Sequence, residues 1–153
     1  MQVAELSSPL PMPIDVVMGA SWVARKAHES IKGIKITESE DSVVINARVT
    51  LMGASIIHKE IYKKDGSVSN GVMRRDVKPG SVDYHAYFTS RGELVLIVKT
   101  YNVYGKLEFV GVEAITLKDD GNTIYCKQAC HINHKNASAL QDFVGKKAPM
   151  PAK

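Results

Sequence analysis

Alternation of apolar and polar residues, interrupted at short intervals by glycine turns, constrains the fold of this chain more than any other feature. In the segment 42–52, SVVINARVTLM, the side chains of Val43, Ile45 and Val49 fall on one face of an extended chain and Arg48 falls on the other. Similar segments follow one another along the chain. About eight strands are predicted, within residues 34–38, 42–52, 55–66, 67–75, 82–92, 93–105, 106–121 and 122–133.

Turn residues separate these strands and fix how they connect. Five glycine-containing turns are predicted, at Asp65-Gly66, Pro79-Gly80, Arg91-Gly92, Gly105 and Asp120-Gly121. No segment of helical length interrupts the series, so consecutive strands pair as an antiparallel meander. The fold class is therefore predicted to be mainly β.

Composition limits the class of protein further. With 153 residues, 44% hydrophobic and 24% charged, the chain has the size and balance of one globular domain. The net charge of +4 is modest and the basic residues are interleaved with acids, which argues against nucleic-acid binding. No apolar run is long enough for a membrane span. The N-terminus lacks a basic region and carries Glu5, and there are only two cysteines, so a cytoplasmic location is expected.

Three segments flank the meander. Residues 1–13 contain three prolines and are expected to form an extended lead-in. Residues 14–33 have apolar positions at helical spacing, with Asp15 as a cap and Gly33 as a C-terminal glycine, and predict one amphipathic helix. Ser138 to Gln141 has the spacing of a capping box, which predicts a short second helix ending at Gly145. The single domain would then span 14–145, followed by a basic tail at 146–153.

A meander of this length is expected to close. Strand twist accumulates, and unpaired edges favour aggregation, so an up-and-down β-barrel with an N-terminal helix and a short C-terminal helix is the predicted architecture. The alternative is a helix-grip α+β fold, in which the sheet wraps a C-terminal helix. The short predicted length of that final helix favours the barrel.

The early helix, the meander and the closing strand NTIYCKQACHI resemble the calycin group, which includes fatty-acid-binding proteins and lipocalins. The resemblance covers residues 14–132 and implies a β-barrel that carries a hydrophobic small molecule, or in a few relatives acts on one. The lipocalin Gly-x-Trp signature is not met, since GASW spaces Gly19 and Trp22 differently. The Arg-x-Tyr pair of fatty-acid-binding proteins is also absent, with Tyr125-Cys126-Lys127 on the last predicted strand. No carboxylate-binding residues are therefore transferred.

The main functional hypothesis is binding of a hydrophobic or amphiphilic small molecule inside the barrel, without a cofactor. Polar and aromatic side chains within the strands would fix the polar end of the ligand. The candidate ligand-binding residues are Tyr62, Tyr84, Tyr87, Lys99, Tyr101 and Arg48. The alternative for each tyrosine is packing at a rim with its hydroxyl in water. Neither the ligand nor the oligomeric state is specified by the sequence.

The second hypothesis is a cofactor-independent isomerase, cyclase or dehydratase on the same scaffold. Glu113 lies in the otherwise apolar FVGVEAITL and shares a face with Phe109 and Ile115, so it is a candidate inward general acid or base. His85 and His58, the latter with Glu60 nearby in sequence, are the candidate histidine partners. Alternatively, Glu113 forms a structural ion pair, for which Lys99 and Arg48 are candidates. A third reading is an interaction module with a filled core.

The segment 123–134, TIYCKQACHINH, concentrates cysteines and histidines without predicting a metal site. On a straight strand, Cys126, Cys130 and His134 share one face, but each step of four residues is ~13 Å. That spacing is too long for a shared zinc ion or for a disulfide between Cys126 and Cys130. Buried thiols acting as small apolar groups are expected.

The loop 69–81, SNGVMRRDVKPGS, carries Arg74, Arg75 and Lys78 between two predicted strands. Its charges could attract an acidic ligand or a membrane surface if the loop acts as a mobile lid. A solvated loop is the favoured interpretation.

Overall fold

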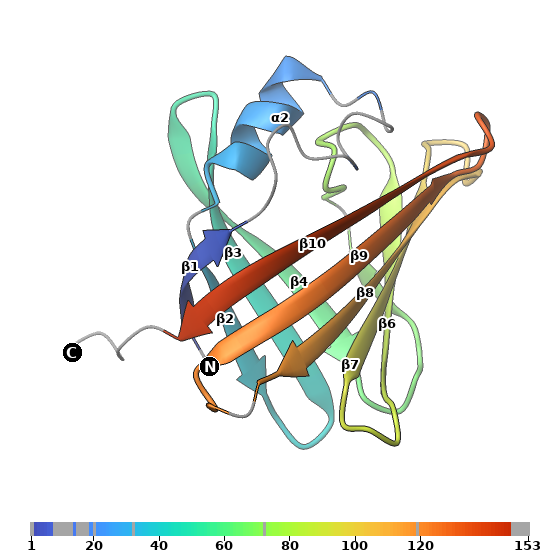
Figure 1. The fold of residues 1–153 in the computed structure, drawn as a ribbon. Helices are drawn as coiled ribbons and strands as arrows, with labels where there is room; N and C mark the ends of the chain where they lie inside the picture. The colour runs from blue at the N-terminus through green and yellow to red at the C-terminus, as the bar shows by residue number, and fades with distance from the viewer. Residues whose placement is uncertain are drawn as a thin grey trace.

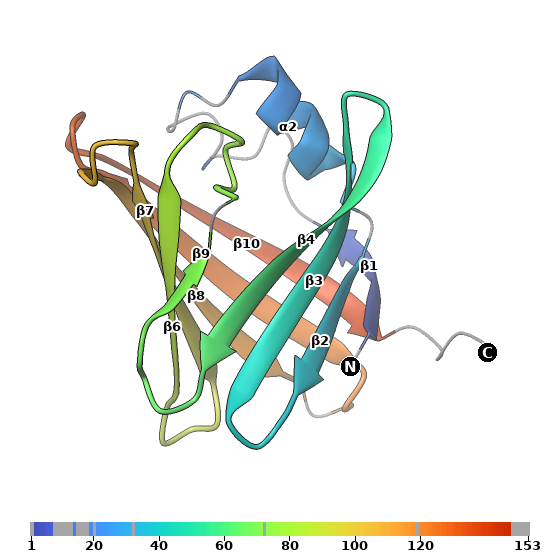
Figure 2. The ribbon, with the colours of Figure 1, turned by 180° about the vertical axis from the view of Figure 1, so that it is seen from behind.

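The structure is a computed structural model that describes residues 2–7, 14, 19, 21–31, 33–71, 73–118 and 120–147, with residues 2–7 described as backbone only. Within these residues the chain forms ten strands and the helix α2 (Figures 1 and 2). The elements are β1 (Gln2–Ser7), α2 (Trp22–Glu29), β2 (Ile34–Glu38), β3 (Ser42–Leu51), β4 (Ala54–Lys63), β5 (Ser69–Gly71), β6 (Ser81–Phe88), β7 (Leu94–Tyr101), β8 (Leu107–Leu117), β9 (Thr123–Ile132) and β10 (Ala137–Lys147).

All strand pairs are antiparallel, and the strand order is β4-β3-β2-β1-β10-β9-β8-β7-β6-β5. Strand β1 joins a three-stranded part (β2 to β4) to a six-stranded part (β5 to β10). It pairs with β2 over only two residues, Gln2 with Lys35 and Val3 with Ile34. The mainly β, antiparallel class predicted from the alternation is confirmed.

The sheet curves so that its two end strands face each other, but it does not close. Among the described residues no hydrogen-bonded ladder joins β4 to β5 or β6. Instead, Tyr62 of β4 packs against Tyr84 of β6 with ring centroids 5.1 Å apart. The closed barrel expected from the sequence is therefore not found. Between β4 and β6, side chains pack against each other where a closed barrel would have backbone hydrogen bonds.

The eight predicted strands are present as β2 to β9. In β3, the side chains of Val43, Ile45, Ala47 and Val49 are buried while Arg48 is exposed, as the alternation predicts. The predicted turn glycines all have positive φ, including Gly80 at 145°, where few other residues are tolerated.

The N-terminal helical region differs from the prediction of one helix over 14–33. Ser21 has extended backbone angles, and its side chain accepts a hydrogen bond from the Ala24 N–H, so α2 begins at Trp22. The predicted cap, Asp15, lies outside the described residues. Trp22 is 67% exposed, and Ala24 and Ala27 form the buried face of α2.

The C-terminal prediction is wrong. Residues 137–147, expected to contain a short helix and the start of a basic tail, form β10 between β9 and β1. Asn136 has φ of 46° and belongs to the turn between β9 and β10. The helix on which the helix-grip alternative relied, predicted from Ser138 to Gly145, is part of strand β10. Capping-box spacing is a local pattern, and here pairing with the free edge of β9 outweighs it.

The helix α2 lies over one end of the curved sheet (Figure 1). Ser30, at its C-terminal end, donates a hydrogen bond to the Ala27 carbonyl (2.5 Å) and accepts one from the Thr50 N–H of β3 (2.8 Å). In the part of the chain that the structure describes, no helix has the length and hydropathy required to cross a membrane. The helix and the curved sheet together position the site described next.

Candidate functional site

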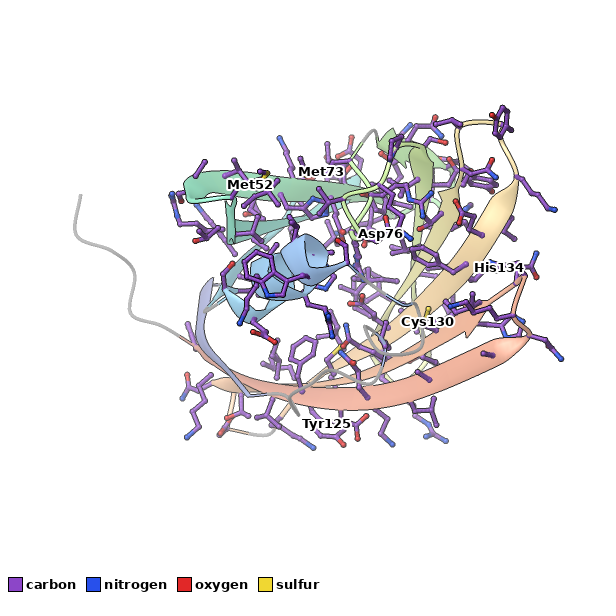
Figure 3. The ribbon with its side chains drawn as sticks, turned by 90° about the horizontal axis from the view of Figure 1, so that it is seen from above. Met52, Met73, Asp76, Tyr125, Cys130 and His134 are labelled. Carbon is purple, nitrogen blue, oxygen red and sulfur yellow. The ribbon has the colours of Figure 1, made fainter. Side chains whose placement is uncertain are left out.

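A cavity of about 490 Å³ lies between the inner face of the sheet, α2 and the segment 73–77. Most of its wall is apolar and comes from several strands. These side chains include Ile45, Ala47, Val49, Ile56, Val98, Phe109, Ile115 and Phe143. The alternation along β3 and β8 explains this wall, because every second residue points inward. Figure 3 looks onto this end of the molecule, with α2 and the loop carrying Met73 and Asp76 above the sheet.

Charged groups interrupt the apolar wall at one place, here called the Arg75 cluster: Glu60, Arg75 and Glu113, with His58 and Tyr62. Arg75 donates to both oxygens of Glu60, from Nε at 2.7 Å and from Nη2 at 2.6 Å. Its Nη1 also donates to Oε1 of Glu113. Two strands, β4 and β8, thus contribute carboxylates to one guanidinium from the loop after β5.

Glu60 has the most complete set of partners in the cluster. Besides Arg75, it accepts hydrogen bonds from Nε2 of His58 (2.8 Å) and from the Tyr62 hydroxyl (2.6 Å). Glu60 is only 2% exposed, and burial alone would raise the pKa of its carboxyl group. The charge and hydrogen bonds of Arg75, with help from His58, outweigh burial and hold the pKa of Glu60 well below its usual range.

The pKa values of two partners of Glu60, Arg75 and Tyr62, are raised. Burial would lower the pKa of Arg75, but Glu113 and Glu60 raise it well above its ordinary value. Burial, reinforced by the negative charge of Glu60, raises the pKa of the Tyr62 hydroxyl. Arg75 is therefore charged and Tyr62 neutral in the folded protein at neutral pH.

A second arginine, Arg74, is buried and holds the loop that carries Arg75. Arg74 is 2% exposed and donates to both carboxylate oxygens of Asp76 (2.8 and 2.6 Å) and to Glu108 (2.7 Å). It also donates to the carbonyl of Tyr101. A Cβ added at Gly80 would lie 2.1 Å from that same carbonyl, so only glycine fits there. The expectation of a solvated loop is wrong for Arg74, which is an internal anchor.

A row of polar side chains continues from the cluster across the inner wall. Glu113 of β8 is opposite Gln128 of β9, which is opposite Gln141 of β10. The Gln141 amide donates to Oε1 of Gln128 (2.6 Å), and Oε1 of Gln141 accepts from the Ile14 N–H (3.1 Å). All three side chains line the cavity. The wall is therefore amphiphilic, with a polar stripe on an apolar background.

Two of the predicted catalytic residues, Glu113 and His58, lie on the cavity wall. They do not contact each other; Glu60 and Arg75 connect them. The ion-pair partner of Glu113 is Arg75, instead of Lys99 or Arg48. Arg75 lies in a loop, 38 residues before Glu113 in the sequence, so the spacing of residues within a strand does not reveal this pairing.

The other predicted site residues lie outside the cavity. Tyr62 and Tyr84 are buried in the core, although the Tyr62 hydroxyl touches the cluster. The remaining five are on outer-facing strand positions: His85, Tyr87, Lys99, Tyr101 and Arg48. The inner faces of β3, β6 and β7 carry the neighbouring residues instead, such as Ala47, Ala86 and Val98. A one-residue shift in an extended chain places a side chain on the opposite face.

Sequence reasoning noted Glu60 only as a neighbour of His58 and Arg75 only as a charge on a loop, and it assigned no site role to Gln128. The alternation of β4 would have placed Glu60 on the same face as His58 and Tyr62. Gln128 could have been found from its place two residues before Cys130. Arg75 follows no periodic pattern, because a loop positions it.

The cysteine- and histidine-rich segment is split between two faces. Cys126 and Cys130 are buried free thiols, as expected. Cys130 lines the cavity, and burial raises the pKa of its thiol to about 11. In Figure 3, Cys130 lies inside the curve of the sheet, Tyr125 on its outer side, and His134 at a distant turn. Among the residues that the structure describes, no group of three or more histidine, cysteine or acidic side chains could hold a metal ion.

Comparison of the chain with family models, with curated proteins and with solved structures finds no match in any of the three.

Proposed function

We propose that this protein binds a hydrophobic or amphiphilic small molecule in the cavity between the curved sheet and α2. The observation that carries the proposal is a cavity of about 490 Å³ with an apolar wall and one polar cluster. Small-molecule sites usually have 300 to 1,000 Å³ of space, mostly apolar linings and a few convergent polar groups. Apolar burial would supply the affinity and the Arg75 cluster would orient the ligand.

The inferred scaffold is that of the calycin group. The short helix α2 precedes β2, strands β2 to β4 and β5 to β10 pair with their neighbours in chain order, and β1 lies beside β10. This order supports the resemblance drawn from the sequence.

Gly111 offers a direct test, because it faces the cavity from β8. A Cβ at this position would have 3.9 Å to the nearest atom, the Ala129 carbonyl oxygen, so a larger side chain can enter the cavity without a backbone clash. The probe is N-phenyl-1-naphthylamine, a neutral dye that fluoresces in apolar sites. We expect Gly111→Leu to weaken dye binding by about tenfold or more, since leucine fills the space.

The matched control is Val112→Leu, on the next residue, which is 37% exposed on the outer face. This variant is expected to bind the dye as the wild type does. Equal dye affinity in wild type and Gly111→Leu, or no binding by the wild type, would overturn the proposal.

A second candidate function is proton transfer on a bound molecule by a cofactor-independent isomerase, cyclase or dehydratase. The observation that favours it is that His58, hydrogen-bonded to Glu60 at 2.8 Å, and Glu113 line the same cavity. The test is native mass spectrometry of the purified protein, followed by incubation of any retained molecule with fresh wild type and Glu113→Gln. Conversion by the wild type alone supports an enzyme; an unchanged molecule supports a carrier.

A further inference from the structure

We propose that the polar end of the cavity selects a positively charged, hydrogen-bond-donating head group, such as that of a long-chain amine, over a carboxylate on the same chain. This inference rests on the proposed function and names its ligand class. Three observations carry it: the charge of the Arg75 cluster, the occupancy of the arginine donors, and a free carboxylate oxygen in the wall.

The Arg75 cluster has more negative than positive charge. Glu60 and Glu113 both contact the single guanidinium of Arg75, so the cluster carries one net negative charge when His58 is neutral. The side chains of Glu60 and Glu113 are only 3% and 9% exposed. An uncompensated charge away from water is unfavourable, and an organic cation would neutralise it. An anionic head group would add a second negative charge.

The arginine donors that could hold a carboxylate are already used. Arg75 makes four hydrogen bonds within the cluster, three to carboxylates and one to the Tyr62 hydroxyl, which leaves one of its five N–H groups. Arg74 also lines the cavity, but it is paired with both Asp76 and Glu108. Neither guanidinium can offer a carboxylate the usual two parallel donors without breaking an internal ion pair.

Glu113 supplies the acceptor. Glu60 accepts four hydrogen bonds, whereas Glu113 accepts one, at Oε1 from Arg75. Its Oε2 accepts none from the described part of the chain. The Glu113 side chain lines the cavity, so this oxygen is available to accept a hydrogen bond from a donor group on a ligand. An ammonium group donates up to three hydrogen bonds and accepts none.

The polar side chains of Gln128 and Gln141, next to the Arg75 cluster, are compatible with a positively charged head group. Oε1 of Gln128 accepts from Gln141, and its amide nitrogen donates to no residue within the described ranges. That amide is neutral and could contact a hydroxyl or carbonyl group on a ligand. It does not change the sign of the charge at the site.

The test compares dodecylamine, dodecanol and dodecanoate, which share one chain length, in displacement of N-phenyl-1-naphthylamine at neutral pH and below their aggregation concentrations. We expect dodecylamine to bind most tightly, dodecanol next, and dodecanoate at least about tenfold more weakly than the amine. In Glu113→Gln, which removes the cluster's net charge, the ratio of amine to carboxylate affinity should shrink by about tenfold. Glu40→Gln, at an exposed position, makes the same change in total charge and should leave the ratio unaltered.

Each result decides between the two claims. Dye binding with dodecanoate equal to or tighter than dodecylamine would overturn the head-group inference while leaving small-molecule binding intact. Dye binding that none of the three displaces would do the same, as would an unchanged ratio in folded Glu113→Gln. The wild-type ranking alone remains decisive if that variant does not fold. Failure of the wild type to bind dye or ligand would overturn the proposed function itself.

Discussion

Arg75 links the architecture of the site to its chemistry. It comes from the loop after β5, yet its guanidinium joins a carboxylate of β4 to one of β8. The Arg75 carbonyl also contacts Nε2 of His28 in α2, at 2.5 Å. One residue therefore connects the loop, the helix and both sides of the curved sheet.

Replacing Arg75 with methionine should reduce the stability of the protein severely. The substitution keeps similar bulk but leaves Glu60 and Glu113 buried without their cation, which typically costs about 3 to 5 kcal/mol. Urea denaturation monitored by circular dichroism measures this change. Arg48→Met is the control, because Arg48 is exposed and bonds only to Ser55 among the described residues, and a loss below about 0.5 kcal/mol is expected. Equal stability of the two variants would contradict the role of Arg75 as the cation that compensates the buried carboxylates of Glu60 and Glu113.

Glu60 makes stability depend on pH in the acid range. Its folded pKa is lowered, so the unfolded chain, with a glutamate pKa near 4.3, binds this proton first as the pH falls. The contribution of Glu60 is thus complete above the unfolded pKa and is lost as the pH drops toward the folded value. We expect the free energy of unfolding to fall by up to about 1.4 kcal/mol per pH unit below pH 4 from this group.

Urea titrations of wild type, Glu60→Gln and Glu40→Gln at several pH values check the assignment. The slope below pH 4 should be flatter in Glu60→Gln and unchanged in Glu40→Gln. A wild-type slope in folded Glu60→Gln would assign the acid sensitivity to other groups.

At the scale of elements, the Ser30 side chain forms a hydrogen bond between the C-terminal end of α2 and β3. Ser30 accepts a hydrogen bond from the Thr50 N–H at 2.8 Å while it donates to the Ala27 carbonyl. Ala27 and His28 of α2 line the cavity, so this attachment holds part of the cavity wall in place.

Ser30→Ala should loosen α2 from the sheet. We expect a loss of about 1 kcal/mol and faster hydrogen exchange at the Thr50 amide, because that N–H loses its acceptor. Ser21→Ala, which removes the N-cap bond to Ala24, should cost a similar amount without changing exchange at Thr50. Unchanged Thr50 exchange in Ser30→Ala would contradict the attachment.

The elements show which features local sequence can reveal. Alternation located β2 to β9, and the buried set in β3 follows it residue by residue. It failed at β10, where Ser138 to Gln141 has helix-start spacing but the open edge of β9 supplies a strand partner. In β6 and β7, alternation did not show which face of the strand points inward. His85 and Lys99 alternate with apolar residues, and an inward-facing polar residue would give the same pattern. The direction in which the sheet curves decides which face is inward, and the sequence of a single strand does not specify that direction.

At the scale of the whole molecule, the cavity forms because the two end regions of the curved sheet meet without backbone pairing among the described residues, and other elements cover the opening. The Tyr62–Tyr84 contact brings the two ends together, while α2 and the loop anchored by Arg74 cover the region where the sheet remains open to the interior. The inward Glu113 was predicted from its apolar surroundings, whereas its partner Arg75 depends on this long-range arrangement.

The most direct test of internal binding is an NMR measurement on protein labelled at the isoleucine δ1-methyl groups, with saturating dodecylamine. The account predicts intermolecular nuclear Overhauser effects from the alkyl chain to Ile45, Ile56 and Ile115, which line the cavity. It predicts none to Ile57, which is 57% exposed on the outer face of β4. Contacts to Ile57 without contacts to the three cavity residues would place the ligand outside and contradict the central claim.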